Sequence, residues 1–117
     1  FPGAFYRKEG TGRIGDLGYA VNMQTGAKSP FIVAEIGPAN ADLGEISVAL
    51  AKALGGINPN PRTGAGVPEG TTLYVVFPNS SRNYHWPYST SNMADVLDNL
   101  LKSVGGIDAA LACKDEF

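Results

Sequence analysis

Two glutamates, Glu35 and Glu45, are the residues of this sequence whose type and spacing most favour catalysis. Paired carboxyl groups in contrasting environments can divide acid–base work, because one stays protonated and donates a proton while the other stays ionised and activates water. Glycoside hydrolysis depends on such a pair. Whether these two groups can cooperate depends on the elements that position them.

Glu35 closes the apolar run that begins at Phe31, and this run predicts a buried strand. The two-residue period of a strand places Glu35 on the same face as Phe31 and Val33. Gly37-Pro38 then ends the strand. The pattern therefore predicts that the carboxyl group of Glu35 has apolar neighbours.

Glu45 opens an apolar segment, residues 46–54, that predicts a short helix buried against the sheet. Its carboxylate is expected in the first helical turn, where free backbone N–H groups favour negative charge. The turn-forming loop 39–44 can bring the end of the strand and the start of the helix to one rim.

These environments predict different roles for the two acids. Apolar surroundings raise the pKa of a carboxyl group and hydrogen bonds to its ionised form lower it, so Glu35 is the expected acid and Glu45 the expected base. Simpler explanations also exist. A glutamate at a strand end often points to water, and one in the first turn often only stabilises the helix.

The loops carry further candidates for contact with a substrate. Asp42 either binds a substrate amine or caps the following helix, and we favour the cap. Tyr84 and Trp86 carry aromatic faces that could stack on sugar rings, although Trp86 could equally fill the rim of the core. His85 has no second His or Cys nearby, so it does not predict a metal site.

Composition predicts one domain, residues 1–117, with many loops. The chain has fifteen Gly and eight Pro, 44% hydrophobic and 17% charged residues, and a net charge of -2. Its basic residues are scattered, which argues against a nucleic-acid partner, and no apolar run is long enough for a membrane span. The one cysteine, Cys113, excludes an internal disulfide. We expect a monomer, and the start at Phe1 without Met suggests that a leader or tag was removed.

The remaining elements follow from periodicity and turn residues. Residues 14–23 and 71–77 predict strands, and the first of them should form a hairpin with the strand that ends near Glu35. The Pro- and Gly-rich segment 57–70 predicts a long loop. An apolar stripe over 93–104, with Asn92 as N-cap and Gly105-Gly106 as terminator, predicts the clearest helix.

Four sequence blocks, in this order, resemble glycoside hydrolase family 75, the chitosanases. The blocks are Ile14-Gly15-Asp16 with Ala20-Val21, then Val33 to Pro38, then Leu43 to Leu50, then Tyr74 to Ser80. The block Gly44-Glu45-Ile46-Ser47 is the most specific of them. The chain departs from the family pattern at Ala34-Glu35, where the family has Gly-Asp, and at Ile46, where it has a small residue.

The resemblance implies that Glu35 and Glu45 are the catalytic pair. It also implies that Asp16 lies near the cleft, where it either binds substrate or stabilises a turn, and that Ser47 and Asn79, which fall within the matching blocks, contact substrate.

The fold that the resemblance implies is mainly β, a small six-stranded double-psi β-barrel with two flanking helices. The implied function is endo-hydrolysis of β-1,4 glucosamine linkages in chitosan, with inversion and without a metal or organic cofactor, by a secreted enzyme. Two alternatives stay open from the residues: a barrel that binds polysaccharide without hydrolysing it, and a lytic enzyme or amidase that acts on peptidoglycan. No Gly-x-Ser-x-Gly motif supports a serine hydrolase.

Overall fold

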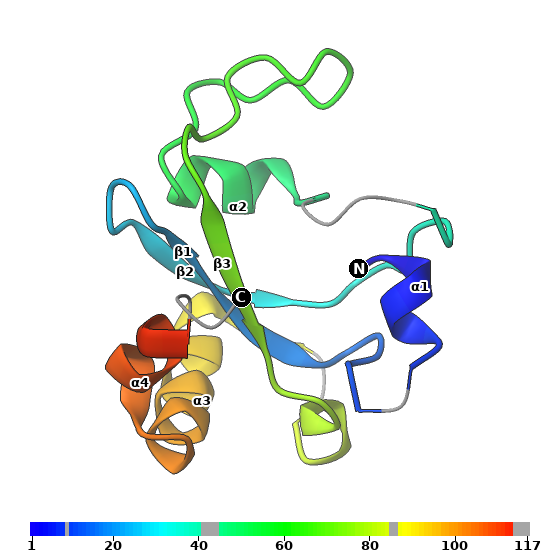
Figure 1. Cartoon of the computed structure of the whole chain (residues 1–117), viewed down its shortest axis with the longest axis vertical. Helices are drawn as coiled ribbons and strands as arrows, with labels where there is room; N and C mark the ends of the chain where they lie inside the picture. Colours follow the sequence, from blue (N-terminus) through cyan, green and yellow to red (C-terminus); the bar gives the residue numbers. More distant parts are fainter. Residues whose placement is uncertain (9, 41–44, 85–86, 114–117) are drawn as a thin grey trace.

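The computed structural model describes residues 1–8, 10–40, 45–84 and 87–113 of the 117-residue chain. Within them the elements follow the order α1 (Gly3–Tyr6), β1 (Leu17–Asn22), β2 (Lys28–Ile32), α2 (Val48–Ala53), β3 (Thr72–Val76), the 3-10 helix η1 (Ser80–Arg82), α3 (Thr90–Ser103) and α4 (Gly106–Ala112). Figure 1 shows their arrangement around the sheet.

The described strands form one three-stranded antiparallel sheet in the order β2-β1-β3. Gly18 of the central strand β1 pairs with Phe31 of β2 on one side and with Val76 of β3 on the other. The strand that leads to Glu35, which was expected to be buried, is β2, and it lies at an edge of the sheet. It also begins and ends earlier in the chain than its apolar run suggested.

The prediction of a six-stranded double-psi barrel is wrong, because the described sheet is open and has three strands. A barrel closes only when every strand has two paired neighbours. Between these strands the described residues are rich in Gly and Pro or fold into helices, and they form no further paired strand. The prediction of two helices is also wrong, because the described residues form two further α-helices: α1 near Phe1, and α4 directly after α3.

The two faces of the sheet are covered by different helices. On one face Ala20 packs against Leu50 and Leu54 of the α2 segment. On the other face, burial and the nearby carboxylate of Asp98 on α3 raise the pKa of the Tyr19 hydroxyl, which places Tyr19 beside α3. Because successive strand residues point to opposite faces, α2 and α3 lie on opposite sides of the sheet, as Figure 1 shows.

Side-chain caps set where the two main helices begin. Ser47 accepts a hydrogen bond from the Leu50 amide and caps α2, and Ser89 accepts one from the Asn92 amide and caps α3. The predicted start of the first helix at Glu45 is therefore three residues too early, since α2 begins at Val48, and the predicted Asn92 cap lies three residues after the observed one. The predicted stop at Gly105 is confirmed, since this residue has a left-handed φ of 98° after α3.

The long segment 57–70 contains no helix or strand, as predicted. It folds back on itself through hydrogen bonds from the Ile57 amide to the Gly66 carbonyl and from the Asn60 amide to the Ala65 carbonyl. Asn22 anchors its end, because its side-chain amide donates to the carbonyl oxygens of Leu54 and Glu69. None of the described helices has the length and apolar character that crossing a membrane requires.

Candidate functional site

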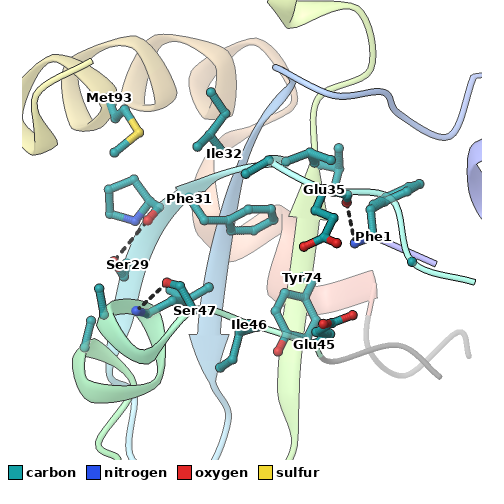
Figure 2. Close-up of a pocket in the computed structure, with 18 of the residues that line it drawn as sticks. Phe1, Ser29, Phe31, Ile32, Glu35, Glu45, Ile46, Ser47, Tyr74 and Met93 are labelled. Atoms are coloured by element: carbon teal, nitrogen blue, oxygen red, sulfur yellow. Dashed lines mark hydrogen bonds between the residues drawn. The ribbon is translucent and has the colours of Figure 1, made fainter. Parts of the chain in front are cut away.

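A cavity of about 660 Å³ lies where the α2 segment meets β2 and the chain that follows β2. This volume falls within the range of about 300–1,000 Å³ that is usual for ligand pockets. Its lining includes both predicted catalytic residues, Glu35 and Glu45, although they come from different elements (Figure 2). No other charged side chain is among the described residues that line it.

The extension of β2 carries Glu35 to this cavity. Past the end of the strand, the Val33 amide donates to the Asp16 carbonyl and the Gly15 amide donates to the Val33 carbonyl, so the backbone stays extended beside β1. Phe31, Val33 and Glu35 all line the cavity. The backbone of Glu35 is held further by its carbonyl oxygen, which accepts a hydrogen bond of 3.0 Å from the Phe1 nitrogen.

Glu45 approaches from the segment that leads into α2. It lies two residues before the cap Ser47, so it is not in the first turn of the helix, where it was expected. Figure 2 shows the carboxylates of Glu35 and Glu45 directed into the same part of the cavity from opposite walls. Both residues are exposed, so Glu35 does not have the buried surroundings that its apolar run predicted.

The floor of the cavity is aromatic. Phe31 and Tyr74 meet edge to face, with ring centroids 6.0 Å apart. Gly18 makes room for this arrangement, because a Cβ at that position would lie 2.2 Å from the tip of the Phe31 ring. Burial raises the pKa of the Tyr74 hydroxyl despite an opposing hydrogen bond with Thr72.

Sequence reasoning missed these two aromatic residues because both were assigned to the core of predicted strands. A usable signal was present. Gly18 interrupts an otherwise regular strand pattern, and a glycine inside a strand often marks a place where another group approaches closely. The cross-strand partner of Gly18 is Phe31, and Tyr74 pairs with the next residue on the same face, Ala20.

Ser47 also lines this cavity, and its hydroxyl oxygen accepts the Leu50 amide at 3.1 Å as the cap of α2. The hydroxyl hydrogen is not used by that bond. Ser47 can therefore cap the helix and donate to a ligand at the same time.

Asp16 and Asn79 lie elsewhere, at a second cavity. The carboxylate of Asp16 is fully buried and accepts hydrogen bonds from the amides of Arg13, Asn79 and Ser81 at 2.9, 3.0 and 2.9 Å. Burial alone would raise the pKa of Asp16, but the bonds from Ser81, Asn79 and Arg13 outweigh it and hold the pKa below its ordinary value. These bonds agree with the alternative in which Asp16 stabilises a turn. Asp16 is not among the residues that line the cavity of Glu35 and Glu45.

The other predicted residues are not brought to the glutamates by the described structure. Tyr84 is half-buried after η1 and is not among the residues that line either cavity. Asp42, His85 and Trp86 lie outside the described residues. Within the described ranges, no group of three His, Cys, Asp or Glu side chains could hold a metal ion.

Comparison with protein-family models gives no match to this chain, and comparison with curated proteins gives none either. The resemblance to family 75 chitosanases therefore stays a prediction. The chemistry of the cavity has to be argued from its own residues.

Proposed function

We propose that this protein is a glycoside hydrolase that cleaves β-1,4 glucosamine linkages in chitosan with inversion, using Glu35 and Glu45. The observation that carries the proposal is that both carboxylates line one cavity with an aromatic floor and no cationic side chain among its described lining residues. The sequence blocks shared with the chitosanases support the same assignment.

The charge of the cavity favours a cationic polymer. The only charged side chains among the described lining residues are acidic, and an ionised carboxylate there attracts the ammonium groups of glucosamine units. Phe31 and Tyr74 supply aromatic surface for the apolar C–H face of a sugar ring. An N-acetylated or anionic polymer would gain less from this site.

The reaction needs one proton donor and one proton acceptor. In the proposed mechanism the protonated carboxyl of Glu35 donates its proton to the glycosidic oxygen, while the carboxylate of Glu45 removes a proton from a water molecule that attacks the anomeric carbon from the opposite face. The bond to the leaving sugar breaks as the new C–O bond forms, and the configuration inverts. A separation of roughly 6.5–9.5 Å between the carboxyl groups leaves room for that water.

The decisive test is the release of reducing ends from chitosan and from chitin. The parent protein should hydrolyse chitosan, and Glu35→Gln and Glu45→Gln should each lose that activity. Glu69→Gln is the matched control, because Glu69 is an exposed acid on the long loop and does not line the cavity. Parent-like hydrolysis by both cavity variants would overturn the proposal.

Leaving-group dependence assigns the two roles. A glycoside with a nitrophenolate leaving group needs little protonation, so it should restore turnover in the variant that lacks the acid but not in the one that lacks the base. Proton NMR of the first product should show the inverted anomer. Restoration in Glu45→Gln and not in Glu35→Gln would exchange the assigned roles.

One observation favours a second candidate function, binding of a cationic polysaccharide without hydrolysis. The carboxylates of Glu35 and Glu45 are exposed and accept no hydrogen bond from other described residues, so nothing there fixes their orientation. A binding module would retain chitosan oligomers without new reducing ends. Lysis of peptidoglycan with indifference to chitosan would instead favour the lytic alternative. Secretion is part of the proposal, because a polysaccharide such as chitosan lies outside the cell.

A further inference from the structure

The second cavity shares no lining residue with the first. It has a volume of about 380 Å³ and lies where the end of α1 and the residues after it meet the turn at Arg13 to Asp16 and the turn at Pro78-Asn79. Its charged lining residues are Arg7, Lys8, Arg13 and Asp16. The proposed glycosidase function does not use it.

The three basic side chains of this cavity have no acidic partner among the described residues. Arg7, Lys8 and Arg13 are exposed, and none forms an ion pair with a carboxylate of the described residues. The Lys8 ammonium lies 5.6 Å from the centre of the Phe5 ring, an aromatic contact that leaves its charge in place. One third of the nine Lys and Arg residues thus border one cavity of a chain whose net charge is -2.

The backbone around these cations is fixed. The Lys8 carbonyl accepts a hydrogen bond of 2.8 Å from the Thr11 hydroxyl. The amides of Arg13 and Asn79 both donate to one carboxylate oxygen of Asp16, which joins two walls of the cavity. A site with a fixed frame loses less entropy when a ligand binds.

Asp16 does not act as a counter-ion for the three cations. It is fully buried, and its two oxygens accept three backbone N–H groups. Those amide dipoles compensate most of its charge locally. The exposed charged side chains among the described lining residues are therefore all basic.

We propose that this second cavity binds a tetrahedral oxyanion, a phosphate or sulfate group that is free or carried by a small molecule. The planar guanidinium groups of Arg7 and Arg13 can each donate two parallel hydrogen bonds to such a group, and Lys8 adds a point charge. Asn79, which is exposed on the facing turn, can donate a further hydrogen bond from its side-chain amide. The site is independent of the reaction at Glu35 and Glu45.

Titration of isotopically labelled protein with inorganic phosphate, at constant ionic strength balanced with chloride, tests the site by NMR. Saturable shifts are expected at the amides of Arg13 and Asn79 and not at those of Glu35 and Ser47. Parallel titrations with sulfate and with glucose 6-phosphate distinguish a free ion from a small-molecule ester. Absence of saturation, or shifts spread over both cavities, would overturn the proposal.

Charge-matched variants make the test specific. Arg13→Gln should bind phosphate at least about tenfold more weakly, and Arg13→Lys should keep part of the affinity. Arg62→Gln, which removes a cation from the long loop, should bind as the parent does. The same spectra report whether each variant is folded. Equal weakening by Arg62→Gln would mean that only the net charge matters, and it would exclude a built site.

Discussion

The two cavities use carboxylates in opposite ways. In the first, Glu35 and Glu45 are exposed at the walls of an aromatic-floored cavity, and no described residue binds their side chains. In the second, Asp16 is buried and accepts hydrogen bonds from three backbone amides, while Arg7, Lys8 and Arg13, which form no ion pair with a described carboxylate, border the cavity. A carboxylate is therefore accessible to a ligand in the first cavity, because it is exposed. In the second it links backbone amides from two turns, because it is buried among them.

The largest expected effect is on catalysis at the first cavity. Glu35→Gln and Glu45→Gln should each lower the rate of chitosan hydrolysis about 10²- to 10⁴-fold, because each removes a proton-transferring group. Their unfolding temperatures should stay within a few degrees of the parent, since both side chains are exposed. Reducing-end assays and calorimetry measure the two effects. A variant whose unfolding temperature fell well below that of the parent would show that its glutamate has a structural role, as Asp16 does.

Asp16→Asn should show the reverse pattern. An asparagine offers one acceptor oxygen where two oxygens now accept three amides, so at least one N–H would face an NH₂ group. We expect a loss of about 2–4 kcal/mol in the free energy of unfolding, measured by urea denaturation. A free energy of unfolding equal to that of the parent would show that the hydrogen bonds of Asp16 do not stabilise the fold.

Gly18→Ala tests the aromatic floor of the first cavity. The new methyl group would meet the Phe31 ring and push it into the cavity, at a cost of about 1–3 kcal/mol in stability and with weaker chitosan binding. Phe31→Leu added to Gly18→Ala should recover much of the stability by clearing that space, but not the binding. Calorimetry and oligosaccharide titration separate the two. Recovery of both would mean that the Phe31 ring does not contact the ligand.

The pH dependence of unfolding should identify Asp16. Its pKa in the folded protein lies below the ordinary value of 3.8, so its ionised form stabilises the fold fully above that pH. The stabilisation is lost as the pH falls through the ordinary value towards the folded one, with a slope of at most about 1.4 kcal/mol per pH unit for one proton. Denaturation curves of Asp16→Asn should lack this part of the acid slope. An identical slope in parent and variant would assign it to other acids.

The smallest effect is expected at the helix caps. Ser47→Ala and Ser89→Ala should each cost about 1 kcal/mol in stability, because each removes the acceptor for one helix amide. Only Ser47 lines the first cavity, so only its variant should weaken the binding of chitosan oligomers. Equal binding by the two variants would limit Ser47 to capping.

Local patterns predicted the elements better than their assembly. The apolar stripe that follows Ser89 and the glycine after it predicted α3 to within a few residues, and the β-branched run around Tyr74 predicted β3. These features depend on neighbours in the chain, which the sequence displays directly. The start of α2 was wrong, because whether Ser47 or Glu45 begins the helix depends on which side chain reaches an amide.

The sequence by itself determined the types of the main elements, the spacing of the two glutamates and the absence of an internal disulfide. Only the tertiary structure decided that the sheet is open, that Asp16 is buried under three amides, and that Phe31 and Tyr74 form a cavity floor. Those outcomes depend on contacts between residues far apart in the chain, such as Asp16 with Ser81 or Gly18 with Phe31. Such contacts leave no periodic trace in the sequence, because their energies exist only once the distant segments have met.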